Sequence, residues 1–254
     1  MDSNQTPEMS EHQRQQLQFQ LFQESLPKVN EMVYWMLLNE TVPLAISVEN
    51  NLSKSSTSEP EASQSLEREL DSKLTLSPTN DLPSHKLLQQ YLTADEEKQA
   101  KIKQRLSNTG FLLGQKLSQL LIFSNNPNIS FKNMDLLTVM KFVCRDVWRQ
   151  MYGKQIDNLK TNHRGTFYLL DYNYKPIESF ALEENLSAQE HTLIEPYLEI
   201  PCGVIRGVLE SLGFQEEGQV VCNATIVEPP ESSGTTITGT PPAISFNVQV
   251  LSTQ

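Results

Sequence analysis

The chain has 254 residues, with 20 Lys and Arg side chains against 31 Asp and Glu, which gives a net charge of −11. Its hydrophobic share of 38% excludes a wholly disordered protein, and no run of about 18 apolar residues is present to form a membrane-spanning helix. The first 18 residues are polar and Gln-rich, unlike a secretory signal, so we expect a cytoplasmic protein. Three cysteines without a CxxC pair argue against a disulfide framework or a zinc cluster.

The charges are not spread evenly along the chain. Residues 1–100 hold 7 basic and 16 acidic side chains, residues 101–170 hold 11 and 3, and residues 171–254 hold 2 and 12. The centre therefore carries a net charge of +8 between two acidic flanks. A basic segment of this kind favours contact with an acidic partner or an anionic surface.

Three stretches have compositions that disfavour regular structure. Residues 1–18 form a Gln-rich tail, residues 50–84 contain no aromatic residue and no Val, Ile or Met, and Pro residues bracket the Ser- and Thr-rich loop 228–242. Such segments bury too little apolar area to offset the entropy of ordering. The sequence therefore predicts a flexible tail and a single domain, 19–254, with a disordered insertion at 50–84 and a flexible loop at 228–242 that connects two strands.

Helical periodicity predicts three long helices in the first part of the domain. Their expected bounds are 26–49, 96–123 and 132–152. Pro43 should kink the first helix or end its regular part. In the second helix, Gly110 and Gly114 would let another backbone approach closely. The apolar stripe of the first helix consists of Val29, Met32, Val33, Met36, Leu37 and Leu44.

The rest of the domain alternates strands with a helical region. A turn at 162–165 joins the first two predicted strands in a hairpin. A capping box of Ser187 and Glu190 starts the helical region, which Pro196 and Pro201 should divide. This order of elements predicts an α+β domain with antiparallel pairing and with its helices grouped on one face. The expected strands are 156–161, 166–170, 219–227 and 243–251, and the second helical piece is 202–212.

The sequence has no pattern typical of an active site. No two histidines have the spacing of metal ligands, and neither a Walker motif nor a strand–GxGxxG–helix unit is present. Cys144 and Cys222 fit core positions. Cys202 precedes Gly203 at the expected start of a helix, where the helix dipole would stabilise a thiolate, so a thiol hydrolase centred on Cys202 stays open as an alternative. We otherwise expect no enzyme, no cofactor and no metal.

The basic side chains of the centre form a candidate surface. An anionic membrane or an acidic protein would fit it, and the alternative is an ordinary solvated helix face balanced by acidic neighbours. Nucleic acid is not expected, because the flanks are acidic and no aromatic residues are interleaved with the basic ones. Three of the side chains lie at i, i+4 and i+8 on the third helix and two lie on the hairpin, namely Lys141, Arg145, Arg149, Lys160 and Arg164.

Two neighbouring segments have a specific pattern. Residues 140–148 read MKFVCRDVW, and residues 154–165 read KQIDNLKTNHRG. Together with CGVIRG at 202–207, they closely resemble the thirty-three-kilodalton type of small subunit of the transport protein particle (TRAPP) complex. The resemblance covers roughly 25–49 and 87–254, which is the whole expected core.

The resemblance implies a fold in which helices pack on one side of a twisted four-stranded antiparallel sheet. It also implies a non-catalytic subunit of a tethering complex that acts as nucleotide exchange factor for Rab-type GTPases in ER–Golgi and intra-Golgi traffic, located at Golgi and ER–Golgi membranes. Subunits of this type form a heterodimer, through their first two helices, with the small subunit that carries a buried acyl chain. In this sequence those helices carry the expected interface residues Tyr34, Leu38, Leu113 and Leu117.

One departure from the family concerns the acyl chain. Palmitoylated relatives carry the acyl-bearing cysteine in the turn before the third helix, whereas residues 124–131 contain no cysteine here. We therefore expect no acyl adduct on this chain. Because relatives of this fold bind apolar ligands inside it, a small apolar-ligand sensor remains the alternative from another functional class.

Overall fold

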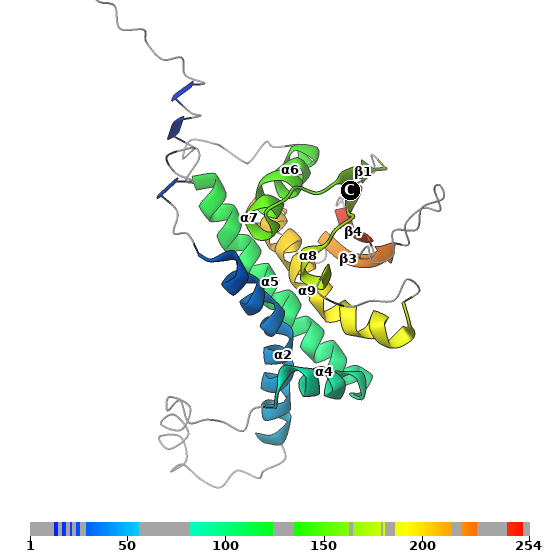
Figure 1. Cartoon of the computed structure of the whole chain (residues 1–254). Coiled ribbons are helices and arrows are strands. Elements are labelled where there is room, and N and C mark those ends of the chain that lie inside the picture. The colour runs from blue at the N-terminus through cyan, green and yellow to red at the C-terminus, as the bar shows by residue number, and fades with distance from the viewer. Residues whose placement is uncertain are drawn as a thin grey trace, which may run out of the picture.

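The computed structural model describes most of the chain from residue 29 onward (Figure 1). Much of the expected tail 1–18, most of the expected insertion 50–84 and the whole loop 228–242 lie outside the described residues. The described residues are 13–14, 17–18, 21, 24–25, 29–55, 82–123, 135–162, 165–178, 180, 186–214, 220–227 and 243–250.

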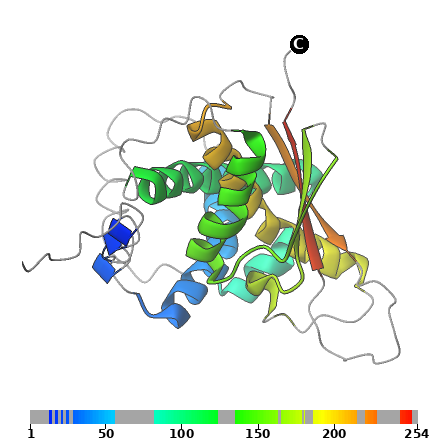
Figure 2. The same ribbon diagram turned by 90° about the horizontal axis from the view of Figure 1, so that it is seen from above.

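A four-stranded antiparallel sheet forms one layer of the fold. Its spatial order is β1-β2-β4-β3, and Val248 of β4 lies between Phe167 of β2 and Cys222 of β3. Gly165 adopts a φ of +84° in the predicted hairpin turn, which a residue with a Cβ rarely does. Figure 2 shows the helices on one side of the sheet, so the predicted α+β fold is confirmed. The strands are β1 Asn158–Thr161, β2 Thr166–Asp171, β3 Val220–Val227 and β4 Ala243–Val250.

The helices form the second layer and include two that were not predicted, α4 and α8. The helix predicted at 96–123 has these bounds in the structure, and the first helix continues through Pro43 to Ser55, into the start of the expected insertion. Within the described residues, no helix is long and apolar enough to cross a bilayer. The helices are α2 Glu31–Ser55, α4 Ser84–Leu92, α5 Glu96–Phe123, α6 Leu136–Phe142, the π-helix η2 Val143–Val147, α7 Trp148–Tyr152, α8 Lys175–Glu178 and α9 Ala188–Ser211.

The π-helical turn η2 connects α6 and α7 to the sheet. At its end the Trp148 N–H donates to the carbonyls of Val143 and Arg145, which leaves the Cys144 carbonyl without its regular helical donor. The Ile156 N–H donates to that carbonyl at 3.0 Å. The wide turn therefore holds the chain that leads into β1 against the helix.

Helix α9 is continuous, so the predicted division at its two prolines is wrong. Pro201 has no N–H to donate to the Tyr197 carbonyl four residues earlier. The Tyr174 hydroxyl donates to this carbonyl instead, at 3.0 Å, and both tyrosine side chains are buried. The predicted capping box of Ser187 and Glu190 is present at the start of the helix.

Glycines let α5 and α9 touch through their backbones, as the spacing of Gly110 and Gly114 predicted. A Cβ on Gly110 would overlap the Ile200 carbonyl, and a Cβ on Gly114 would overlap the Val204 carbonyl. Gly203 and Gly207 of α9 face the α5 backbone in the same way. A Cβ on Gly203 would overlap the Ser107 carbonyl, and a Cβ on Gly207 would overlap the Phe111 carbonyl. The two helices therefore run parallel at a separation that only residues without side chains permit.

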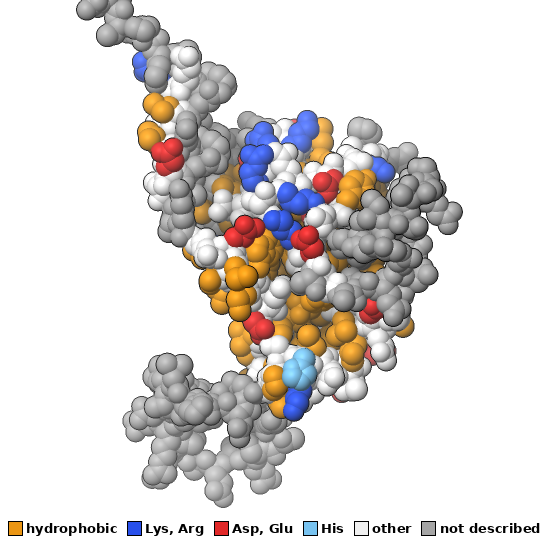
Figure 3. Space-filling model, in the orientation of Figure 1, with side chains coloured by type: hydrophobic (Ala, Val, Ile, Leu, Met, Phe, Trp, Pro, Cys, Tyr) orange, Lys and Arg blue, Asp and Glu red, His pale blue; other side chains and the backbone are white. Residues whose placement is uncertain are grey.

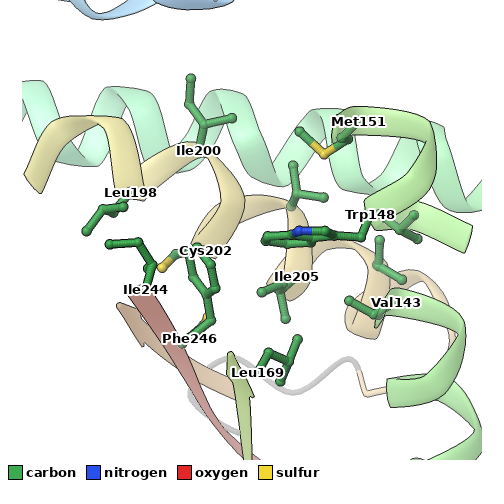
Figure 4. Close-up of a cluster of buried hydrophobic side chains, with 14 of the residues drawn as sticks. Val143, Trp148, Met151, Leu169, Leu198, Ile200, Cys202, Ile205, Ile244 and Phe246 are labelled. Atoms are coloured by element: carbon green, nitrogen blue, oxygen red, sulfur yellow. The ribbon is translucent and has the colours of Figure 1, made fainter. Parts of the chain in front are cut away.

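Large side chains fill the space between these helices and the sheet (Figure 4). Trp148 packs at 4.7 Å from Tyr152 and at 5.1 Å from Phe246, measured between ring centroids. Tyr174 contacts both Tyr152 and Phe246. All four aromatic side chains are fully buried, so the middle of the domain is occupied by the chain itself.

The three cysteines are buried free thiols. Burial raises the pKa of Cys144 to about 12. Cys202 lies within α9 rather than at a helix start, and a hydrogen bond to Cys222 together with burial raises its pKa well above the usual range. The thiol hydrolase alternative is therefore wrong, because Cys202 has neither the expected dipole stabilisation nor access to a substrate.

Replacing Gly114 by Ala should destabilise the domain by about 1–3 kcal/mol, because the added methyl group pushes the α5 and α9 backbones apart. Chemical denaturation followed by circular dichroism measures the free energy of unfolding. The matched control is Asn108→Ala on the exposed side of α5, which should change this energy by less than about 0.5 kcal/mol. Equal stability of Gly114→Ala and the parent chain would contradict the backbone contact.

The thiols should react with a disulfide reagent at pH 8 at least about 100-fold more slowly in the native chain than in denaturant, because all three are buried and raised pKa values further suppress the thiolates of Cys144 and Cys202. Absorbance of the released thiol measures the rate. A single fast-reacting cysteine in the native chain would show that one site is open, and Cys202→Ser would identify it.

Candidate partner interface

Helix α2 turns a row of apolar side chains away from the domain. Met32, Met36 and Leu37 are 72%, 63% and 64% exposed; Val33 and Leu44 are exposed as well, and so is Val29 just before the helix. These six residues are the predicted apolar stripe, which we call the α2 apolar face. In a monomeric protein such a contiguous apolar row is uncommon and marks an interaction site.

The opposite side of α2 packs on the domain. Val42, Ala45 and Ile46 are buried, and Trp35 and Leu38 pack against the core. The helix is therefore apolar on both sides, which is typical of a helix covered by more than one neighbour. Within the described residues, one side of α2 is covered by the domain and the other is exposed.

Polar contacts fix the orientation of α2. Buried Glu49 accepts a hydrogen bond from Arg105 of α5 at 3.1 Å. At the other end, Trp35 donates to Glu31 at 3.2 Å and lies under the Lys175 ammonium, which is 5.3 Å from the ring centroid. The hydrogen bond from Trp35, with a smaller effect of Lys175, lowers the pKa of Glu31. These contacts hold the α2 apolar face outward.

The four predicted interface residues occupy different environments. Tyr34 is half-buried and meets the edge of the Trp35 ring at 5.2 Å, and burial raises its pKa. Leu38 and Leu117 are half-buried and pack against the core. Leu113 is 38% exposed on α5. The α2 apolar face and Leu112 of α5 are more exposed than these four residues, but they were not predicted as interface residues. The sequence alone does not show which apolar side chains of a helix face the core, so it could not separate the two groups.

The predicted basic residues lie on a second surface. Lys141, Arg145 and Arg149 are exposed on α6, η2 and α7, and Lys160 is exposed on β1. Arg164 lies outside the described residues. Figure 3 shows Lys and Arg side chains gathered over the end of the molecule that α6 and α7 form.

Lys154 forms ion pairs inside the fold, so it is not counted with the exposed basic residues. It binds the buried carboxylate of Asp171 at 2.5 Å and the carboxylate of Asp157 at 2.9 Å. Burial lowers the pKa of Lys154, but the two carboxylates outweigh this effect and leave the pKa above its ordinary value. Asp171 also accepts from the Trp148 indole at 2.9 Å, so this hydrogen bond joins β2 to α7 and the ion pair joins β2 to the segment that follows α7.

The geometry offers little support for an internal ligand or metal. A pocket between α2, α7 and α9, lined by Leu38, Tyr152, Tyr197 and others, has room for about one water molecule. That space is too small for an acyl chain. In the described part of the chain, no group of three or more His, Cys, Asp or Glu side chains could hold a metal ion.

Comparison with known proteins places the chain among trafficking subunits. Trafficking protein particle complex subunit 6B of human and cattle is 39% identical over 113 residues, which are 44% of this chain and 65% of the relative, so the match spans just under two thirds of that protein. Subunit 6b of Danio rerio is 37% identical over 122 residues, 47% of this chain and 71% of the relative.

A solved structure is also similar. It is the crystal structure of a trafficking protein particle complex subunit 3 from Naegleria fowleri covalently bound to palmitic acid, with a TM-score of 0.43, 17% identity, and coverage of 66% of this chain and 90% of that chain. The family model for transport protein particle (TRAPP) components matches residues 82–248, which is more than half of the sequence. The chain therefore belongs to the TRAPP component family, as the motifs at 140–165 indicated.

Proposed function

We propose that this chain is a non-catalytic core subunit of a TRAPP vesicle-tethering complex, in which it forms a heterodimer with a homologous small subunit that carries an acyl chain. The observation that carries the proposal is the α2 apolar face of a chain that belongs to this family. Leu112, Leu113 and Leu120 of α5 are exposed as well, and α5 is the second of the two helices through which the resemblance implies pairing.

The energetics favour a stable partner over a bare surface. Burying one exposed Met or Leu side chain stabilises an association by roughly 1.5–3 kcal/mol before the costs of association are counted. The α2 apolar face alone offers four exposed Met and Leu side chains and two exposed Val side chains. A permanent, largely apolar interface of the kind found in obligate complexes fits this surface.

The role of the subunit in the complex follows from the same resemblance. We infer that it supports nucleotide exchange on a Rab-type GTPase through the assembled complex, at Golgi and ER–Golgi membranes, in ER–Golgi and intra-Golgi traffic. The filled core and the buried thiols support a structural contribution over a catalytic one. They also disfavour the alternative of an apolar-ligand sensor, because the pocket near Tyr152 and Tyr197 holds about one water molecule.

Charge placed on the α2 apolar face should prevent heterodimer formation. Met36→Asp combined with Leu37→Asp would bury two carboxylates without partners, and we expect at least about 100-fold weaker binding of the small subunit. The tagged full chain is purified from cells of its source, and the co-purifying subunits are identified by mass spectrometry.

The matched control is Leu82→Asp, which charges a 40% exposed leucine before α4. It should retain every subunit that the parent chain recovers. Recovery of no TRAPP subunit by the parent chain would contradict the proposed complex. If the double variant recovers the same TRAPP subunits as the parent chain, the proposed α2 interface is contradicted but the proposed membership of the complex is not.

Nucleotide exchange should require the assembled complex. The isolated chain is expected to leave the rate of fluorescent GDP release from a Rab-type GTPase unchanged, because its described residues form no catalytic constellation. The complex reconstituted with the chain should accelerate release relative to the complex assembled without it. Acceleration by the isolated chain would overturn the non-catalytic assignment.

A further inference from the structure

Cations without acidic partners remain at the end of the molecule formed by α6, η2, α7 and β1. Within the described part of the chain, Lys141, Arg149 and Lys160 form neither an ion pair nor a side-chain hydrogen bond, although all three are exposed. Arg145 is also exposed and pairs with its neighbour Asp146 at 2.9 Å. We call these four side chains the basic surface.

Three of the four carboxylates near this surface are held in ion pairs. Asp146 binds Arg145, and both Asp157 and Asp171 bind Lys154. Asp135, which precedes α6, is the carboxylate of the described residues 135–171 that has no ion pair there. The described residues 135–171 hold five Lys and Arg side chains against four Asp side chains, so the region keeps a small excess of positive charge, although the whole chain has a net charge of −11.

One exposed tyrosine lies opposite the cation on β1, and a second follows the end of β2 near Asp157. Tyr168 of β2 is opposite Lys160 in the strand register and is 38% exposed. Tyr172, just after β2, is 50% exposed. A tyrosine ring with a polar hydroxyl suits the boundary between water and a bilayer, where this residue type gathers.

We propose that the basic surface binds the headgroups of an anionic lipid bilayer. Long cationic side chains can meet a fluid layer of headgroups without fixed geometry, and each contributes about fivefold to the partition coefficient. An acidic peptide would instead be held by a buried apolar or aromatic anchor, and the described residues of this surface present extended cations.

This inference goes beyond membership of a tethering complex and does not need the heterodimer. The α2 apolar face could also adsorb to lipid, but it would bind neutral and anionic vesicles alike. Dependence on anionic lipid therefore separates the two surfaces. High salt should weaken binding through the basic surface and leave apolar adsorption in place.

The test is co-sedimentation of the full chain with phosphatidylcholine vesicles that contain either no phosphatidylserine or about 30 mol% of it, at about 0.1 M salt. The chain should bind the anionic vesicles more strongly. The variant Lys141→Gln, Arg149→Gln and Lys160→Gln should lose about 100-fold of this partitioning, because three cations are removed.

A matched control removes the same net charge elsewhere. Lys86→Gln, Lys98→Gln and Lys101→Gln lie on α4 and the start of α5, at the opposite end of the molecule (Figure 1). The control should bind within about threefold of the parent chain, and circular dichroism should show equal folding of all three proteins. Equal binding to both vesicle types, or equal losses in the two variants, would overturn the proposal. A further outcome would also overturn it: the Lys141, Arg149 and Lys160 variant loses binding to polyglutamate beads but keeps its binding to vesicles. That result would assign the surface to an acidic protein.

Discussion

The direct backbone contact between α5 and α9 is the constraint around which the helical layer is arranged. Gly110 and Gly114 on one helix and Gly203 and Gly207 on the other leave no room for side chains between them. Helix α9 also packs on β3, so it lies between α5 and the sheet. With one side of α5 closed in this way, α2 rests elsewhere on α5, joined through Glu49 and Arg105. The outward direction of the α2 apolar face is thus a consequence of a contact between four glycines.

Local signals in the sequence were sufficient for most of the fold. The bounds of α5 and the position of β4 within the expected strand 243–251 depend on residues a few positions apart, and both were predicted. The continuity of α9 was not predicted, because the hydroxyl that donates to the Tyr197 carbonyl belongs to Tyr174, which is 23 residues away in the chain. A proline signals a lost hydrogen bond, but tertiary structure decides whether another donor replaces it.

The candidate site was harder to predict for a related reason. Helix α2 is apolar on two sides, and hydrophobic periodicity cannot distinguish a side that faces the core from one that faces a partner. Docking of Val42 and Ile46 onto the domain resolves this, and it leaves Met36 and Leu37 outside. Charge counting had a similar limit. The sequence shows a centre of +8, but ion pairs such as Lys154 with Asp171 remove part of it from any surface.

Aromatic side chains of the chain itself fill the interior of the described domain. Trp148, Tyr152, Tyr174 and Phe246 occupy the space between helices and sheet, and each makes contacts that fix the backbone around it. Tyr174, for example, both packs on Phe246 and completes α9 through its hydroxyl. Opening a channel here would remove aromatic packing and leave the Tyr197 carbonyl unsatisfied, at a cost of about 3–5 kcal/mol for the loss of a single large aromatic side chain. Among the described residues, the aromatic side chains thus stabilise the fold from the inside, while the α2 apolar face and the unpaired cations lie on its outside.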